Sequence, residues 1–258
     1  MIEAIASGSL VGLSLGLIGG GGSILAVPLL VYVVGVPAPH IAIGTSALAV
    51  AVNAAAGLVG HARARTVKWP CALVFAASGL VGAAIGSTLG KAIDGEKLLA
   101  LFGVIMVVVG LSMLRKRRSL DDPDVHLDAN SARRLLPRLV ITALGVGILS
   151  GFFGIGGGFL IVPGLIAATA MPILNAIGSS LVAVTTFGLT TASNYALSGL
   201  VDWQLAAEFI AGGIIGGIAG TWLANRLGAD KNKLRFVFSA IVIVVGLYVV
   251  ARGITNIL

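Results

Sequence analysis

Long apolar segments separated by short polar stretches make up most of the chain. They do not alternate apolar and polar residues as the strands of a membrane barrel do. A helix needs about 20 apolar residues to cross roughly 30 Å of hydrocarbon, and the longer segments reach or approach this length. We predict five helical pieces in each half of the chain: residues 4–18, 24–36, 40–61, 69–92 and 98–114, then 139–153, 159–170, 175–197, 203–224 and 234–251.

The first two pieces of each half are shorter than the others. At a rise of 1.5 Å per residue, a helix of 13 to 15 residues spans only about 20 to 22 Å. These pieces are therefore either tilted short spans or a re-entrant hairpin that glycines interrupt. The composition agrees with a membrane location, because 57% of the 258 residues are hydrophobic, 10% are charged and the mean hydropathy is +1.06. The pattern predicts an all-α polytopic membrane protein.

The two halves resemble each other in sequence. When Pro28 is aligned with Pro163, two glycine-rich runs coincide, and the similarity continues downstream with glycine, serine and tryptophan in the same order. We therefore predict a first transmembrane repeat (1–114), a basic connector (115–138) and a second transmembrane repeat (139–258). The matching segments are 18–28 with 154–163, 42–46 with 176–180, and 67–69 with 201–203.

Basic residues predict that the repeats have inverted topology. Arg63, Arg65 and Lys68 lie in one loop, whereas the equivalent loop around Asp202 has no basic residue, so the two loops should face opposite sides of the membrane. An inverted pair requires an odd number of crossings in each repeat, which five helical segments satisfy. With the basic loops inside, the connector is cytoplasmic and both termini are extracytoplasmic. The net charge of +7 then reports orientation, and we expect no nucleic-acid partner.

The glycine-rich runs are the first candidate binding elements. A helix that starts after a break offers unpaired N–H groups and a partial positive charge, and glycine lets an anion approach the backbone. Hydroxyl groups near the next helix start could complete a cage of neutral donors. The alternatives are that the glycines only allow close helix crossing and that the hydroxyls cap helices. The candidate substrate-binding residues are Gly20, Gly21, Gly22, Ser23, Thr45, Ser46, Gly156, Gly157, Gly158, Ser179 and Ser180.

A second group of residues could act as a gate or proton relay. His61 ends its helix and is equivalent to Tyr195 in the other repeat, and Asn53 lies within an apolar helix. Glu208 follows Trp203 by less than two turns. Simple interfacial or interhelical roles are the alternative for all four. We expect no enzymatic activity, because the remaining histidines, His40 and His126, fall in an interhelical loop and in the connector, without a catalytic motif.

Metal and redox chemistry find no support in the sequence. Cys71 is the single cysteine, so it cannot form an internal disulfide, and no cysteine or histidine cluster has metal-ligand spacing. We therefore expect neither a cofactor nor a metal.

The duplicated glycine run followed by Val-Pro, the Gly-Thr-Ser and Gly-Ser-Ser elements and the tryptophan at the next helix start resemble the TauE/SafE family of sulfite and organosulfur-anion exporters. The resemblance covers essentially the whole chain. It implies a multi-pass protein of the bacterial cytoplasmic membrane that exports sulfite, sulfoacetate or a related organosulfonate. A permease for a small monocarboxylate or another oxyanion is the alternative. The expected partners are a small anion and the lipid bilayer, and a homo-oligomer is left open.

Overall fold

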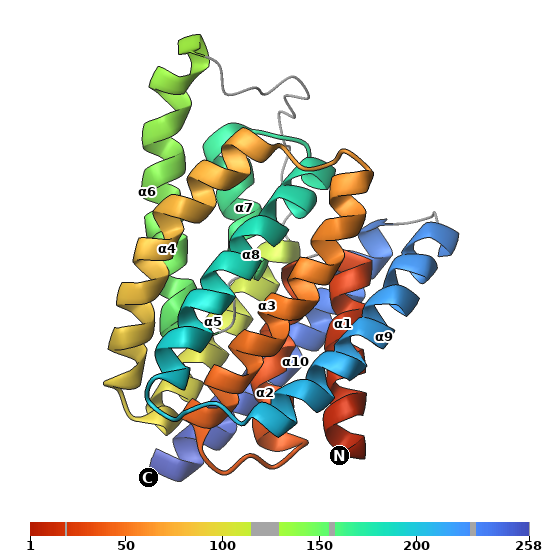
Figure 1. Ribbon diagram of the computed structural model, residues 1–258. Coiled ribbons are helices and arrows are strands. Elements are labelled where there is room, and N and C mark those ends of the chain that lie inside the picture. The colour runs from red at the N-terminus through yellow and green to blue at the C-terminus, as the bar shows by residue number, and fades with distance from the viewer. Residues whose placement is uncertain (19, 115–128, 155–157, 228–230, 258) are drawn as a thin grey trace.

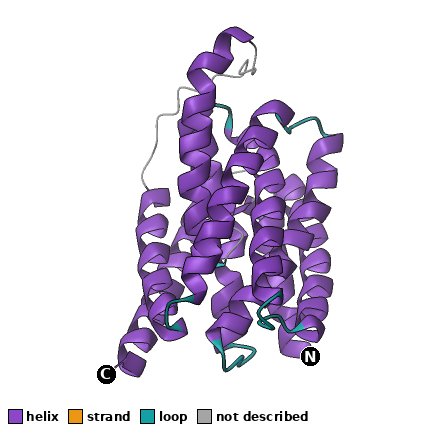
Figure 2. Cartoon of the chain, turned by 60° about the vertical axis from the view of Figure 1, so that its left-hand side comes forward, coloured by secondary structure: helices purple, strands orange, loops and turns teal. Residues whose placement is uncertain are grey.

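The computed structural model describes residues 1–18, 20–114, 129–154, 158–227 and 231–257. Within these ranges all regular structure is helical (Figure 2). The first repeat contains α1 (Ile2–Ile18), the short 3-10 helix η1 (Gly20–Leu25), α2 (Ala26–Tyr32), α3 (Pro39–Arg63), α4 (Trp69–Lys91) and α5 (Gly95–Leu114). The second contains α6 (Ala129–Phe153), α7 (Gly158–Thr169), α8 (Ile173–Ala196), α9 (Trp203–Leu227) and α10 (Lys231–Ile257).

Six helices in the described part of the chain are long and apolar enough to cross a membrane. They lie within α3, α4, α5, α6, α8 and α9, and α1, α7 and α10 add shorter apolar helices. The prediction of an all-α polytopic membrane protein is thus confirmed. Trp69 and Trp203 stand exposed at the starts of α4 and α9, where tryptophan commonly marks the membrane interface. Large exposed apolar side chains cover the outer helices, among them Leu73, Leu80, Ile85, Val104, Val108, Ile215, Ile218, Val244 and Leu247.

Each repeat begins with a helical hairpin. In Figure 1, α1 rises from the end that carries both termini, and α2 returns to that end after the glycine break. The α6–α7 hairpin enters from the opposite end. The equivalent helices α3 and α8 also run in opposite directions, as do α4 and α9. These directions support the predicted inversion of the repeats, which stays a prediction about their origin.

Helices of one repeat pack mainly against helices of the other repeat. Helix α1 packs mainly on α9, and its equivalent α6 packs mainly on α4. The other two large interfaces join equivalent helices, α3 with α8 and α5 with α10. Each of these four interfaces therefore joins one helix of the first repeat to one helix of the second. The α3–α8 pair lies between the two hairpin interfaces, and most of its inward residues are buried.

Glycines allow the crossings of α1 with α9 and of α4 with α6. A Cβ atom on Gly216 would overlap the carbonyl oxygen of Ser9, and one on Gly82 would overlap that of Leu144. Because backbones touch directly at these points, helix separation is smaller than any side chain allows. The scattered glycines thus serve the packing role that small residues commonly have in membrane helices.

The start of α6 differs from the expected boundary. The predicted connector ends at residue 138, whereas α6 already begins at Ala129 and extends beyond the other helices at the upper end of Figure 1. Arg133 and Arg138 are exposed on this extension, which also contains Pro137. A solvated polar helix has no long apolar run, so hydropathy did not reveal it. Residues 115–128 of the connector lie outside the described residues.

Candidate functional site

Described residues that flank the two glycine breaks lie in the protein core. In the first hairpin, Gly20, Gly21 and Gly22 open η1, and a Cβ atom on Gly22 would stand 2.5 Å from the backbone nitrogen of Leu15 on α1. Ser23, the next candidate, is fully buried. The 3-10 helix η1 contacts α7, the helix that follows the break of the other hairpin. The elements after the two breaks therefore meet each other inside the helix bundle.

The second break has a similar environment. Gly154 ends the α6 segment with a positive φ of 65°, and a Cβ atom there would overlap the side chain of Ile43 on α3. Gly158 begins α7 and is buried. The candidates Gly156 and Gly157 lie outside the described residues. Because Ile43 directly precedes the Gly-Thr-Ser element, the structure places this glycine break beside one of the two predicted hydroxyl-bearing segments.

The four candidate hydroxyls are buried and already bonded. Thr45 Oγ1 accepts the backbone N–H of Asp202 at 3.0 Å, and Ser179 Oγ accepts that of Lys68 at 2.9 Å. Asp202 and Lys68 are equivalent residues, so each repeat anchors the loop before the long fourth helix of the other. Ser46 and Ser180 donate to backbone carbonyls three residues earlier, those of Ile43 and Ile177. The structure thus shows a tethering role, and their contact with substrate stays a prediction.

Asn53 is a buried amide near the middle of α3. It is 8% exposed, and neither its oxygen nor its nitrogen has a hydrogen-bond partner among the described residues. A Cβ atom on Gly213 of α9 would overlap this amide, and one on Gly12 of α1 would overlap the Gly213 carbonyl. Gly12 and Leu15 are three residues apart, about 4.5 Å along the helix axis. The Asn53 amide therefore lies at nearly the depth of the first glycine break.

The equivalent residues His61 and Tyr195 lie at opposite ends of the α3–α8 pair. His61 Nδ1 is 2.9 Å from Thr66 Oγ1, which donates to the His61 carbonyl. The tyrosine ring packs on Gly44 and is fully buried, and its hydroxyl has no hydrogen-bond partner in the described part of the chain. The structure therefore satisfies the polar group at one end of the pair but not at the other.

Lys91 gives the Tyr195 end a positive charge. Its ammonium donates to the backbone and side-chain oxygens of Asn194 at 3.0 and 2.8 Å and to Ser198 Oγ at 2.8 Å, and it stands 5.9 Å from the centre of the Tyr195 ring. These three acceptors are neutral. The positive charge is thus held in place without being neutralised by them.

His40 is the residue that sequence reasoning missed at this end. It stands in the first turn of α3, its Nε2 is 3.0 Å from the carbonyl of Ile93, and its ring centre is 6.2 Å from that of Tyr195. Its Nδ1 is buried without a hydrogen-bond partner within the described residues. The sequence signal was Pro39, which is favoured at the first position of a helix and marks the start of α3 before this histidine.

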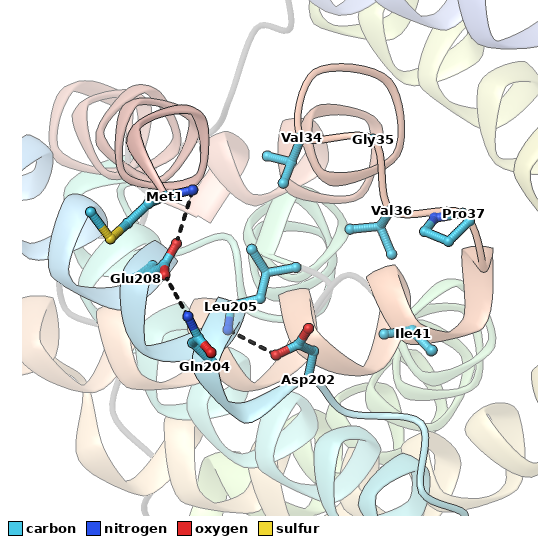
Figure 3. Close-up of a pocket in the computed structure, with 10 residues that line it drawn as sticks. All are labelled: Met1, Val34, Gly35, Val36, Pro37, Ile41, Asp202, Gln204, Leu205 and Glu208. Carbon is cyan, nitrogen blue, oxygen red and sulfur yellow. Dashed lines mark hydrogen bonds and ion pairs between the residues drawn. The ribbon is translucent and has the colours of Figure 1, made fainter.

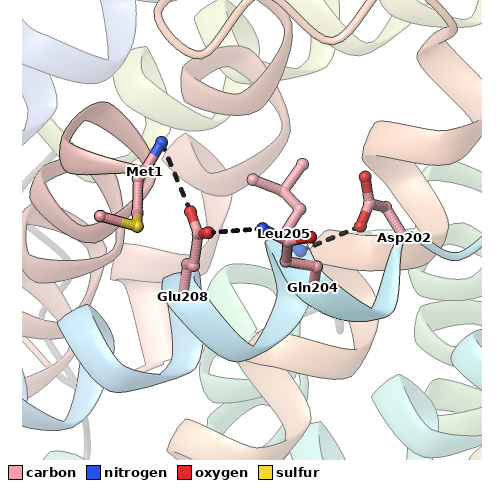
Figure 4. A network of polar contacts seen from close by, with 5 residues as sticks. All are labelled: Met1, Asp202, Gln204, Leu205 and Glu208. Carbon is pink, nitrogen blue, oxygen red and sulfur yellow. Dashed lines mark hydrogen bonds and ion pairs between the residues drawn. The ribbon is translucent and has the colours of Figure 1, made fainter.

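Glu208 lies in an open pocket of about 410 Å³ at the end of the molecule that carries the N-terminus (Figure 3). Its carboxylate is 3.5 Å from the Met1 amine and accepts a bond from Gln204 at 3.3 Å. Asp202 lines the same pocket and caps α9 by accepting the Leu205 N–H at 2.9 Å (Figure 4). Two carboxylates on one wall disfavour an anion, so this pocket does not fit the expected substrate.

Metal ligation has no support in the described residues, where no group of three or more histidine, cysteine or carboxylate side chains gathers. Cys71 is a buried free thiol.

Comparisons with known proteins agree with this architecture. A family model described as sulfite exporter TauE/SafE matches residues 4–249. A probable membrane transporter protein of Xylella fastidiosa is 56% identical over 253 residues, covering 98% of this chain and 96% of the relative. The probable membrane transporter protein YunE of Bacillus subtilis is 26% identical, covering 92% and 93%. No solved structure matches the chain. The chain belongs to the TauE/SafE family of membrane transporters.

Proposed function

We propose that this membrane transporter exports a small sulfur-containing anion, such as sulfite, sulfoacetate or a related organosulfonate, across the bacterial cytoplasmic membrane. The observation that carries the proposal is the meeting of η1 and α7 in the core, because each follows a glycine break. Breaks of this kind at a repeat interface are where secondary transporters commonly bind their substrates. The description of the matching family as sulfite exporters supports the sulfur-anion class.

The chemistry around the breaks favours a neutral cage for the anion. Backbone N–H groups at helix starts bind oxyanions well, and the buried amide of Asn53 adds a donor at nearly the depth of the first break. Thr45 and Ser179 accept backbone bonds and so keep their own hydroxyl protons for a further acceptor. A cage of neutral donors binds an anion reversibly, since no buried cation holds it permanently.

The proposed orientation follows from the charges at the two ends of the bundle. The loop between α3 and α4 lies at the end where α6 starts (Figure 1). Arg63, Arg65 and Lys68 therefore share that end with the arginine-bearing extension of α6. Positive residues favour the cytoplasmic side. This end is cytoplasmic in the proposal, and the end with both termini, Lys91 and Tyr195 is extracytoplasmic.

Ligand stabilisation followed by flux tests the proposal. Purified protein in detergent is heated with sulfite, sulfoacetate, acetate, lactate or sulfate at constant ionic strength, because a ligand at 100 times its Kd stabilises the folded state by about 2.7 kcal/mol. Anions that raise Tm are then loaded into proteoliposomes and their efflux is measured. Stabilisation and efflux with sulfur anions support the proposal. A response to carboxylates alone makes the protein a carboxylate permease, and no response to any anion overturns the proposal.

A further inference from the structure

Two neighbouring side chains at the terminus-bearing end of the bundle each carry a buried polar atom without a hydrogen-bond partner among the described residues. The atoms are Nδ1 of His40 and the hydroxyl oxygen of Tyr195, and the centres of the two rings are 6.2 Å apart. A buried hydroxyl or ring nitrogen without a partner destabilises a folded protein. One such atom can be a packing accident, but two neighbouring side chains from different repeats offer bonding capacity to one ligand.

The surroundings of the pair select an anion. Lys91 places an ammonium group over the Tyr195 ring, and its three bonded oxygens are neutral. His40 also stands in the first turn of α3, where the helix dipole is positive. The charged groups nearby are otherwise engaged: Asp94 accepts bonds from the first turn of α5, and Asp202 and Glu208 bond within α9. Glu96 and Lys97 lie in that same first turn of α5.

The pair also adjoins the second glycine break. Gly154 packs against Ile43, three residues and about one helical turn from His40. A Cβ atom on Gly90, next to Lys91, would overlap the carbonyl oxygen of Phe152, two residues before Gly154. The second glycine break therefore lies within about one helical turn of His40.

We propose that His40 and Tyr195 form a second anion subsite, at the extracytoplasmic end of the pathway, that binds a sulfonate or sulfite group together with one proton. The inference rests on the proposed function, since it extends the path of the same anion. The carbonyl of Ile93 can only accept a bond, so His40 Nε2 carries hydrogen and faces it. A proton on Nδ1 then points to the anion, and the Tyr195 hydroxyl donates beside it.

The cytoplasmic end has no equivalent subsite. The counterpart of Tyr195 is His61, whose Nδ1 already bonds Thr66, and the counterpart of Thr66 near Tyr195 is Leu200. A Cβ atom on Gly44 would overlap the carbonyl of Leu200, as one on Gly178 would approach Thr66 Oγ1 at 2.7 Å. The backbone packing around Gly44 and Gly178 is thus similar at the two ends, whereas of the equivalent residues Tyr195 and His61 only Tyr195 has a polar atom without a hydrogen-bond partner among the described residues.

Binding of methanesulfonate tests the subsite, because this anion keeps its charge across the pH range in which an imidazole titrates. In the wild-type protein, the apparent Kd from thermal stabilisation should fall severalfold as pH is lowered from about 8 to about 5.5. Tyr195→Phe retains the ring and should weaken binding about tenfold while raising the Tm of the ligand-free protein, since it removes an unpartnered hydroxyl. Tyr248→Phe is the matched control, because that residue is 45% exposed.

His40→Gln gives the second arm of the test. Glutamine can keep a donor for the carbonyl of Ile93 but has no group at the position of Nδ1, so the pH dependence of binding should be lost. If the wild-type protein binds methanesulfonate or sulfite and both variants bind with the same Kd and the same pH dependence, the subsite is refuted while the proposed function stands. If the wild-type protein binds neither of these anions, the subsite is refuted, and the proposed function fails as well when sulfoacetate and the other anions also give no response.

Discussion

Replacing Thr45 with valine separates the tethering role of this hydroxyl from a role in binding substrate. Valine keeps the β-branched shape but leaves the backbone N–H of Asp202 without its acceptor, now 3.0 Å away on Thr45. A lost bond of this kind costs about 1–2 kcal/mol when the donor is shielded from water. Ser179→Ala removes the equivalent acceptor from Lys68 and should cost a similar amount.

Thermal unfolding in detergent measures both losses. Thr186→Val is the matched control, because the Thr186 hydroxyl donates to the carbonyl of Val182 in its own helix and its removal leaves no N–H unpaired. Thr45 and Ser179 tether different loops, so the double variant should lose the sum of the single losses within about 0.5 kcal/mol. Stability equal to the control in both single variants would refute the tethering explanation. Normal stability with anion efflux lost would assign the hydroxyls to substrate binding.

Three further predictions concern packing, the buried amide and orientation. Gly145→Ala and Gly147→Ala both gain about 1 kcal/mol of helix propensity, but only a Cβ atom at Gly147 overlaps another helix. In chemical unfolding, the Gly147→Ala variant should therefore be about 1–3 kcal/mol less stable than the Gly145→Ala variant. Asn53→Leu removes two unpartnered polar atoms and should unfold at an equal or higher temperature, while efflux from proteoliposomes falls at least about tenfold if the amide donates to the anion. In a cysteine-free background, a cysteine at exposed Leu197 should react with an impermeant maleimide in intact cells and one at exposed Ala64 should not; the reverse pattern would invert the proposed orientation.

The helices and the duplication were accessible from the sequence because they depend on local patterns. Apolar runs located the α-helices of the described residues but not the 3-10 helix η1, which begins within the glycine run. The alignment of Pro28 with Pro163 identified the equivalent breaks. Helix ends were harder to predict in charged segments, which have no apolar run, as at Ala129, where α6 begins in a polar segment. The contacts of the glycines on α4 and α9 with Leu144 and Ser9 join distant parts of the chain and needed the structure.

The environment of the candidate site could not be read from the sequence, because its bonds join distant residues. Thr45 and Asp202 are 157 positions apart, and Ser179 and Lys68 are 111 positions apart. A sequence shows that a hydroxyl lies near a helix start but not which loop folds onto it. His40 illustrates the same limit, because the sequence does not show that Tyr195 of α8 packs beside this half-buried histidine.

Differences between the repeats explain how a nearly symmetric frame can treat its two ends differently. Each large interface joins equivalent or exchanged helices, so symmetry alone would give both ends of the pathway the same affinity for an anion. The sequence breaks this equality at a few facing positions: Asn53 corresponds to Phe187, and His61 corresponds to Tyr195. Phe187 packs on Gly79 and stacks on Phe75, so the second repeat offers no amide at that depth.

These differences between the repeats affect where along the pathway an anion binds, and they do not set the net direction of its transport. A passive pathway moves its ligand down the electrochemical gradient whatever the affinities of its subsites, because an intermediate site changes no end state. For an anion, an inside-negative potential favours exit by about 2.3 kcal/mol per charge for each 100 mV. A proton that enters the subsite from outside and leaves with the anion does not change the net charge transported. It reduces only the charge carried in the last step, from the subsite to the outside, and the effect appears where this step limits the rate. Efflux should then become less sensitive to membrane potential at low external pH in the wild-type protein, and His40→Gln should remove that change.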